Sequence, residues 1–170
     1  MLFRSSCDIL DSDTPGHHYK GDVSDILERG WDLMIAHPPC QHLAVSGARW
    51  FKAKVEEQKE ALRFVQLLMD APINKIAIEN PVSVISSKIR KPDQIIQPWQ
   101  FGDEFTKTTC LWLKNLPLLT PTDIVGKGEM VIHGGKKIAK WYSNRERKRD
   151  KTFQGIANAM ANQWGKKDSS

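Results

Sequence analysis

The sequence lacks the features that mark secreted and membrane proteins. Its 170 residues include three cysteines, Cys7, Cys40 and Cys110, which are too few for a disulfide framework and form no Cys-x-x-Cys pair typical of a structural metal site. No apolar run approaches the length of a signal peptide or a membrane span. We therefore expect a soluble, cytoplasmic protein in a reducing compartment, with no membrane partner.

Acidic residues are outnumbered, because 25 lysines and arginines against 20 aspartates and glutamates give a formal net charge of +5. The basic excess is concentrated near the C-terminus and fits a polyanionic partner, most simply a nucleic acid such as DNA. A solvated basic loop without a ligand is the alternative. The length, with 40% hydrophobic residues, suits a single domain over residues 1–170. The basic cluster comprises Lys136, Lys137, Lys140, Arg145, Arg147, Lys148, Arg149 and Lys151.

Apolar periodicity predicts alternating strands and helices. A strand over residues 32–36, an amphipathic helix over 55–69 and a strand over 75–78 follow in that order. This order predicts a parallel crossover, with a ligand crevice outside the carboxyl ends of the two strands. The other expected elements are a strand over 1–8, a turn-rich stretch over 11–21, a short helix over 23–29, an antiparallel or edge strand over 109–113 and a closing helix over 153–164.

Cys40 follows the first strand of this unit in the segment His37-Pro38-Pro39-Cys40-Gln41. Two prolines cannot continue a strand, and they hold the cysteine with little conformational freedom. Such placement suits a nucleophile. The alternative is a buried cysteine that packs as a small hydrophobic residue.

Glu79 follows the second strand, directly after the apolar run that ends at Ile78. A carboxyl group at the end of an apolar strand loses water, which favours the protonated form that can donate a hydrogen bond to a ring nitrogen. The alternatives are a helix cap or an ion pair with Lys75 or Lys88. Because carboxyl ends of neighbouring parallel strands meet at one edge, we expect Cys40 and Glu79 to lie there together.

Both segments resemble motifs of the cytosine-C5 DNA methyltransferases. Residues 38–41 (Pro-Pro-Cys-Gln) resemble the nucleophile motif of that family, and Glu79-Asn80 resembles its glutamate motif. The segments 78–81 (Ile-Glu-Asn-Pro) and 110–114 (Cys-Leu-Trp-Leu-Lys) are most similar to short phage-encoded members. Three more motifs resemble the family in the family's order: Cys7-Asp8, Gly21-Asp22-Val23 and residues 155–159 (Gly-Ile-Ala-Asn-Ala).

The resemblance implies an α/β fold of the Rossmann-like, S-adenosylmethionine-dependent methyltransferase type: a mostly parallel sheet with helices on both faces. It also implies methyl transfer from S-adenosylmethionine to cytosine in DNA, with Cys40 as the nucleophile and Glu79 as the residue that binds the ring. The implied cofactor-binding residues are Asp8 at the ribose, Asp22 at the adenine, Asn158 at the methionine part, and Pro38. The implied substrate-binding residues are Pro39, Gln41, Arg49, Asn80, Lys107 and Thr109, with Arg49 on a loop that closes over a flipped base.

Three departures separate this chain from that family. The sequence starts in what resembles the second strand, so the fold is expected to be truncated at its N-terminus, with weakened cofactor binding and an exposed edge that invites a second copy or a partner chain. The family's Gln-x-Arg-x-Arg segment is replaced by residues 107–110 (Lys-Thr-Thr-Cys), which lack an arginine to orient Glu79. A basic excursion over 120–150 stands in place of a target-recognition domain.

Other functions remain open on the sequence. The chain could bind nucleic acid or nucleotides through a retained pyrimidine pocket without transferring a methyl group, or act on a free or modified pyrimidine nucleotide without S-adenosylmethionine. A metal site built from His37, Cys40 and His42 with His17 or His18 matches no common zinc spacing. An amino-methyltransferase is disfavoured, because Cys40 stands where those enzymes place an aromatic ring.

Overall fold

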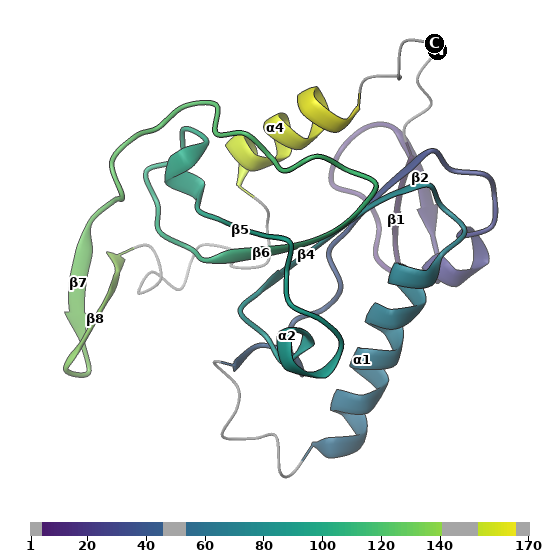
Figure 1. Ribbon diagram of the computed structural model, residues 1–170, viewed down its shortest axis with the longest axis horizontal. Coiled ribbons are helices and arrows are strands. Elements are labelled where there is room, and N and C mark those ends of the chain that lie inside the picture. Colours follow the sequence, from purple (N-terminus) through teal and green to yellow (C-terminus); the bar gives the residue numbers. More distant parts are fainter. Residues whose placement is uncertain (1–4, 46–53, 141–152, 166–170) are drawn as a thin grey trace.

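A computed structural model of the chain describes residues 5–45, 54–140 and 153–165, which form small sheets and helices (Figure 1). The strands are β1 (Ser5–Asp8), β2 (His17–Lys20), β3 (Leu33–Ala36), β4 (Lys75–Pro81), β5 (Gln94–Ile96), β6 (Thr109–Lys114), β7 (Met130–His133) and β8 (Lys136–Ala139). The helices are α1 (Val55–Asp70), α2 (Ile85–Lys88) and α4 (Gln154–Trp164), with the 3-10 turns η1 (Val23–Asp25) and η3 (Pro98–Gln100).

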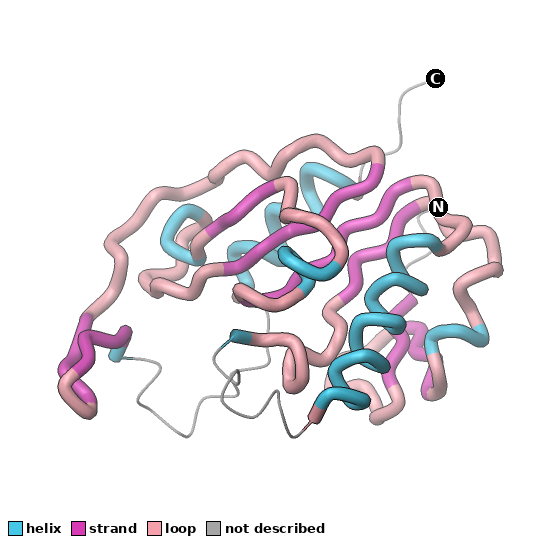
Figure 2. Tube along the Cα trace, turned by 60° about the horizontal axis from the view of Figure 1, so that its bottom comes forward, coloured by secondary structure: helices cyan, strands magenta, loops and turns pink. Residues whose placement is uncertain are grey.

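The central element is a four-stranded sheet with the order β3-β4-β6-β5 (Figure 2). β3 and β4 pair in parallel across α1, so the predicted crossover is confirmed. β6 pairs antiparallel with β4 on one side and with β5 on the other. Its predicted antiparallel direction is therefore confirmed, whereas an edge position is wrong.

The predicted Rossmann-like fold is wrong, because the sheet is not mostly parallel. Within the described residues the four-stranded sheet has one parallel pair, and the strands β1–β2 and β7–β8 form two separate two-stranded sheets. The connection from β5 to β6 contains the short turn η3 but no long helix. Without a crossover helix the chain returns antiparallel, and β6 enters between β4 and β5 instead of extending a parallel array.

The two core clusters of the molecule lie on opposite faces of the four-stranded sheet. Side chains alternate along β4, so Ile76 and Ile78 pack with Val65 of α1, whereas Ala77 packs with Ile156 of α4. Figure 1 shows α1 and α4 on either side of the sheet. This burial fixes the register of β4 and hence the face of the sheet on which the side chain of Glu79 lies.

Both long helices were predicted within a residue or two of their observed bounds. α1 ends at Asp70 because Pro72 restricts the residue before it, and Ala71 adopts an extended conformation with φ −52° and ψ 143°. The second residue of α4 is Gly155, where a Cβ atom would lie 1.8 Å from the carbonyl oxygen of Phe101. Glycine is thus required for the close approach of α4 to the loop after η3.

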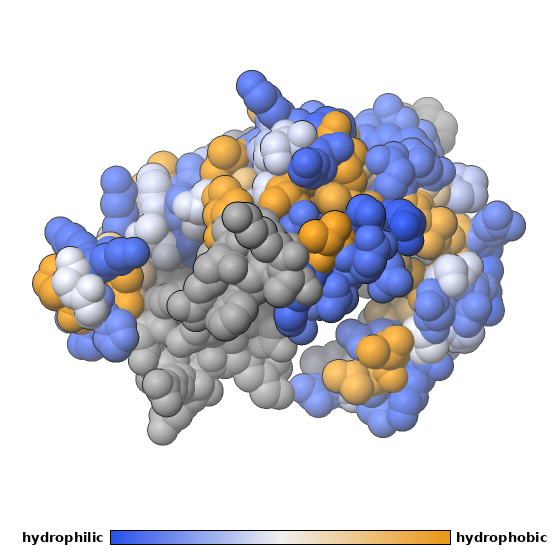
Figure 3. Space-filling view, turned by 90° about the horizontal axis from the view of Figure 1, so that it is seen from below, coloured by the Kyte–Doolittle hydropathy of each residue, from blue (hydrophilic) through white to orange (hydrophobic). Residues whose placement is uncertain are grey.

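The sequence patterns did not predict three of the strands. β2 lies inside the stretch interpreted as turn-rich and pairs in parallel with β1. β7 and β8 form a hairpin inside the basic excursion, with Gly134 and Gly135 at φ 56° and 75° in its turn. The hairpin carries apolar as well as hydrophilic groups at the left of Figure 3, and the side chain of Ile132 is 72% exposed.

None of the helices in the described part of the chain combines the length and the apolar character that crossing a membrane requires.

Candidate functional site

The candidate site begins where the pairing of β3 with β4 ends. Ala36 lies opposite Ile78 in the parallel register, so the next residues, His37 and Glu79, follow this pair side by side. Nδ1 of His37 lies 3.0 Å from Oε2 of Glu79, within hydrogen-bond distance. The side chain of Glu79 is 12% exposed and that of His37 is 41% exposed. The carboxyl group is therefore largely withdrawn from solvent, with the imidazole on its outer side.

Asn80 connects the proline turn to β4. Its side chain is buried, and Nδ2 donates a hydrogen bond of 3.0 Å to the carbonyl oxygen of Pro38, which is buried as well. β4 also continues through Glu79 to Pro81 and pairs there with β6, so the prediction that this strand ends before Glu79 is wrong. The segment that carries Glu79 is therefore rigid backbone in the sheet.

Cys40 lies exposed at the start of a turn that is anchored on both sides. Its carbonyl oxygen accepts hydrogen bonds from the backbone N–H groups of Leu43 and Ala44, at 3.0 and 2.9 Å. Ala44 then forms a β-bridge with Ser83, just after β4. The cysteine thus has a solvent-accessible thiol on a held backbone, as the nucleophile interpretation expects; it is not the buried packing residue of the alternative.

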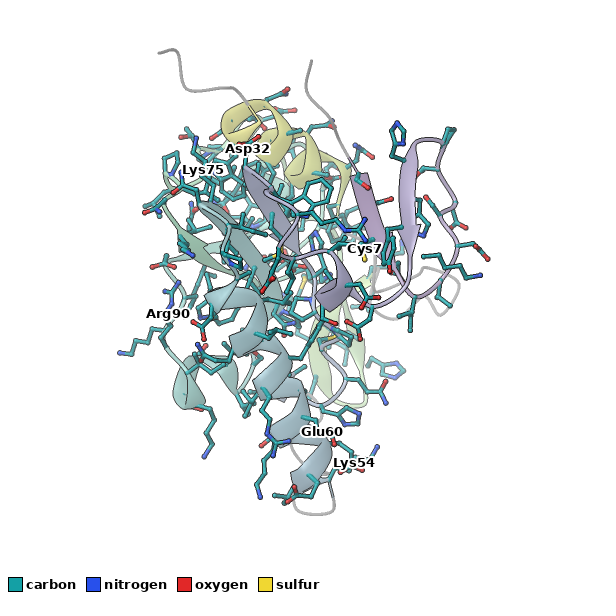
Figure 4. All side chains as sticks on the ribbon, turned by 90° about the vertical axis from the view of Figure 1, so that its right-hand side faces the viewer. Cys7, Asp32, Lys54, Glu60, Lys75 and Arg90 are labelled. Atoms are coloured by element: carbon teal, nitrogen blue, oxygen red, sulfur yellow. The ribbon has the colours of Figure 1, made fainter. Side chains whose placement is uncertain are left out.

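Helix α1 contacts this turn from the side. Nε2 of Gln58 donates a hydrogen bond of 3.2 Å to the carbonyl oxygen of His42. In Figure 4 the first turns of α1, marked by Lys54 and Glu60, lie at the opposite end of the helix from Asp32 and Lys75, which stand where β3 and β4 begin. The amino end of α1 therefore lies at the carboxyl ends of the strands, where Cys40 and Glu79 are found.

Next to Glu79, in β6 and in the residues after Glu79, lie a buried thiol, that of Cys110, and two buried oxygen atoms without hydrogen-bond partners among the described residues. Cys110 of β6 lies opposite Asn80, and burial, followed by the charge of Glu79, raises the pKa of its thiol. Oδ1 of Asn80 and Oγ of Ser83 are buried and have no hydrogen-bond partner in the described part of the chain. Buried polar atoms are usually paired, so this segment has hydrogen-bonding capacity that the fold does not use.

The other predicted substrate-binding residues lie at varying distances from this turn. Pro39 and Gln41 flank Cys40 and are exposed. Thr109 is buried opposite Pro81, and its Oγ1 donates to the carbonyl oxygen of Lys107 at 3.2 Å. The Nζ atom of Lys107 lies 5.7 Å from the centre of the Phe153 ring. Arg49 lies outside the described residues.

Asp8 and Asp22, the predicted ribose and adenine contacts, are brought together by the β1–β2 pair. The N–H of Gly21 donates to the carbonyl oxygen of Asp8 at 3.0 Å. Burial and the charges of the nearby Asp8, Asp22 and Asp25 raise the pKa of the Cys7 thiol. Hydrogen bonds from Oγ and N of Ser24 hold the pKa of Asp22 below its usual range.

The chemistry of this pair fits part of S-adenosylmethionine. Carboxylates accept hydrogen bonds from ribose hydroxyls and from an adenine amine, and the side chains of Ile9 and Leu10 beside Asp8 are 72% and 68% exposed. Asn158 is elsewhere, on α4, where its Oδ1 accepts a hydrogen bond from Gln154 of the same helix. The residues present therefore fit the nucleoside half of the cofactor, and a role for Asn158 and Pro38 stays a prediction.

Three residues of the site escaped the sequence interpretation. His37 was considered only as a metal ligand, although its place directly after a parallel strand predicts a side chain beside Glu79. Ser83 and Cys110 carry no local signal, because their positions depend on the antiparallel pairing of β6 and on the Ala44–Ser83 bridge. A surface hollow between α1 and β6, lined by Met69, Trp112 and Lys114 among others, contains none of the predicted site residues.

The histidines and cysteines do not assemble into a metal centre in the described ranges, where no group of three or more possible ligands lies close enough to hold an ion.

Comparisons of the chain with protein-family models, curated proteins and solved structures found no match. The function proposed below therefore depends on the geometry of the site and on the motifs that resemble a known family.

The exposures of the three thiols predict how they react with iodoacetamide. Cys40 is exposed and should react first, Cys7 is partly buried, and Cys110 is buried with a raised pKa that keeps it in the unreactive thiol form. We expect Cys110 to react at least about 10²-fold more slowly than Cys40 in native protein, because it must wait for local opening. Peptide mass spectrometry over time measures this, with protein in urea as the control in which all three react. Rapid native labelling of Cys110 would contradict the structure.

Proposed function

We propose that this protein acts on the pyrimidine ring of cytosine in DNA, by attack of the Cys40 thiolate at C6 and transfer of a methyl group to C5. One observation carries the proposal: two hydrogen bonds, between His37 and Glu79 and from Asn80 to Pro38, connect the segment that leads to the exposed Cys40 with the strand that carries Glu79. A nucleophile and a carboxyl group at adjacent strand ends are the two groups this chemistry needs. The motif resemblance gives independent support for the same residues.

The proposed reaction overcomes the weak nucleophilicity of C5. The thiolate of Cys40 uses its electron pair to form an Sγ–C6 bond, and the π electrons of the C5=C6 bond move into the ring toward C5 and N3. C5 becomes an enamine carbon that takes up an electrophile. Loss of the C5 proton to water then reforms the double bond, breaks the Sγ–C6 bond and returns the thiolate.

Glu79 would stabilise the charge that this attack creates. Its carboxyl group donates a proton to N3 as negative charge develops there and accepts a hydrogen bond from the exocyclic amine of the base. The largely buried position of the side chain strengthens both interactions, because they form away from bulk water. Glu79 therefore contributes most in the transition state, where the charge on the ring is largest.

DNA is the proposed substrate because the chain carries exposed basic residues that could bind its phosphates. A base inside a duplex is not accessible to Cys40 and must leave the stack. Lys136 and Lys137 on the exposed β7–β8 hairpin would contribute backbone affinity that falls with salt. The hairpin, with the exposed Ile132 and Met130, is small, so we propose weak sequence preference.

S-adenosylmethionine is the proposed methyl donor, and when bound it supplies the electrophilic methyl group that C5 takes up. Asp8 and Asp22 would hold its ribose and adenine.

A second candidate is a pyrimidine-binding protein that has lost methyl transfer. It is favoured by the separation of the β1–β2 pair from the four-stranded sheet, because the proposed donor site then lacks a shared scaffold with Cys40. A second copy or a partner chain that pairs with these short strands would restore a shared scaffold for the donor site and Cys40.

The test uses DNA that carries tritium at C5 of cytosine. Reversible thiolate attack lets C5 take a proton from water and lose its tritium, so release of tritium into water reports the attack without any cofactor. We expect release from single-stranded DNA by the wild-type chain and by the matched Cys7→Ala variant, and added S-adenosylmethionine should then place a methyl group on C5. Release without methylation would support the second candidate with a functional nucleophile; no release with or without cofactor would rule out the proposed reaction.

A further inference from the structure

We infer that His37 is a positioning residue for this reaction: its imidazole holds one oxygen of the Glu79 carboxyl group so that the other oxygen faces the pyrimidine ring. The inference rests on the proposed function and deepens it. His37 would also replace the arginines that orient the glutamate in the family and that are missing from residues 107–110 of this sequence.

The backbones of both partners are held on either side of the hydrogen bond. Before His37, β3 pairs with β4 up to Ala36, and after it the carbonyl oxygen of Pro38 accepts a hydrogen bond from Asn80. Glu79 lies within β4 itself, opposite Leu111 of β6. A glutamate side chain is flexible, but a 3.0 Å hydrogen bond from a fixed neighbour to Oε2 restricts the rotation of its carboxyl group.

The hydrogen bond from His37 becomes stronger as the reaction proceeds. When Glu79 gives the proton on Oε1 to N3, its carboxyl group becomes a carboxylate, and the Nδ1–H of His37 donates to the Oε2 atom that shares the new charge. Hydrogen bonds to an ionised acceptor are roughly twice as strong as neutral ones. On the return path N3 gives the proton back to Oε1, so the imidazole is never consumed and needs no co-reactant.

The groups around the pair are consistent with this role. Cys110 of β6 lies opposite Asn80, the residue after Glu79, and a thiol carries no positive charge in either protonation state. Asn80 and Thr109 are neutral, and the Nζ atom of Lys107, two residues before β6, lies 5.7 Å from the centre of the Phe153 ring. Cys40 and His42 follow His37 along the chain, and Cys40 is exposed. Among these groups the imidazole is the one within hydrogen-bond distance of the carboxyl group.

Two substitutions of His37 test the role in the tritium-release assay. His37→Ala removes the donor, and we expect the rate constant of release to fall about 10- to 100-fold, the range of a lost hydrogen bond to a charged group. His37→Asn places an amide N–H near the position of Nδ1 and should restore most of the rate.

A second readout does not depend on activity. In nitrogen-15 NMR spectra at alkaline pH, the neutral His37 ring of the wild type should carry its proton on Nδ1, and Glu79→Ala should shift it toward Nε2. An unchanged tautomer would overturn the pairing, and equal release by wild type and His37→Ala would overturn its importance. No release by the wild type would overturn the proposed function and the role of His37 with it, while the spectra still report whether the pair forms.

Discussion

Replacement of Cys40 with alanine is expected to abolish tritium release from cytosine C5, with a fall of at least about 10³-fold. No other group in the proposed reaction forms the bond to C6, so removal of the thiol removes the covalent step itself. Cys40→Ser should be nearly as inactive, because a hydroxyl group ionises far less readily than a thiol at neutral pH. Release of tritium into water, measured over time with DNA in excess, gives both values.

The position of Cys40 allows the loss of the thiol to be tested without a loss of stability. The side chain is exposed and its turn is held by backbone hydrogen bonds, so Cys40→Ala should change the free energy of unfolding by less than about 0.5 kcal/mol. DNA affinity should be unchanged as well. The matched control is Cys7→Ala, which removes a thiol on β1 (Figure 4) and leaves the residues of the Cys40 turn unchanged. Full activity of Cys40→Ala would rule out the covalent mechanism, and equal loss in Cys7→Ala would point to a general effect on folding.

The parts of the fold that follow local patterns could be predicted from the sequence. α1 and α4 have apolar residues at helical spacing, and α1 has Pro72 as a stop signal, so the predicted ranges agree with the structure. The pairing of β3 with β4 also follows from order, because a helix between two strands brings the second back parallel. These rules depend only on neighbouring residues and on a single crossover, and they were sufficient to predict the two long helices and the pairing of β3 with β4.

The architecture as a whole could not be predicted, because it depends on pairings between distant segments. The mostly parallel sheet was inferred from motif resemblance, whereas the register of β6 between β4 and β5 decides the observed arrangement. A strand was predicted over residues 1–8, which contain β1, but β2, β7 and β8 are four-residue strands, too short to give a clear period-two signal. Local polarity marked their stretches as turn-rich or as a basic excursion.

The candidate site was predicted in position but not in detail. The rule that strand ends meet at one edge placed Cys40 and Glu79 correctly at the carboxyl ends of β3 and β4. The hydrogen bonds of the site were not predicted: the alternatives considered for Glu79 were a helix cap or an ion pair with Lys75 or Lys88, whereas its carboxyl group is bonded to His37. Partner choice depends on side-chain geometry of about an ångström, which spacing along the chain does not contain.

Replacement of Trp112 with alanine is expected to cost about 3–5 kcal/mol of the free energy of unfolding, the usual range for a fully buried aromatic residue. Trp112 is 1% exposed and packs in the core cluster between β4 and α1. Its Nε1–H also donates a hydrogen bond of 2.8 Å to the carbonyl oxygen of Arg90. The substitution removes both the packing and this bond, which is a large part of the 5–15 kcal/mol typical of a domain. Urea unfolding followed by far-ultraviolet circular dichroism measures the change.

Two companion variants separate the contributions to this loss. Trp112→Phe keeps an aromatic ring but removes the N–H, so its cost should be smaller and should include the unpaired carbonyl group of Arg90. Ile124→Ala is the surface control, since Ile124 is 70% exposed, and it should change stability by less than about 0.5 kcal/mol. If Trp112→Ala costs no more than Ile124→Ala, the face of β6 toward α1 is not the core of the molecule. The anchoring of the Glu79 strand by that core would then fail as well, because Ile76 and Ile78 of the same strand pack in the same cluster.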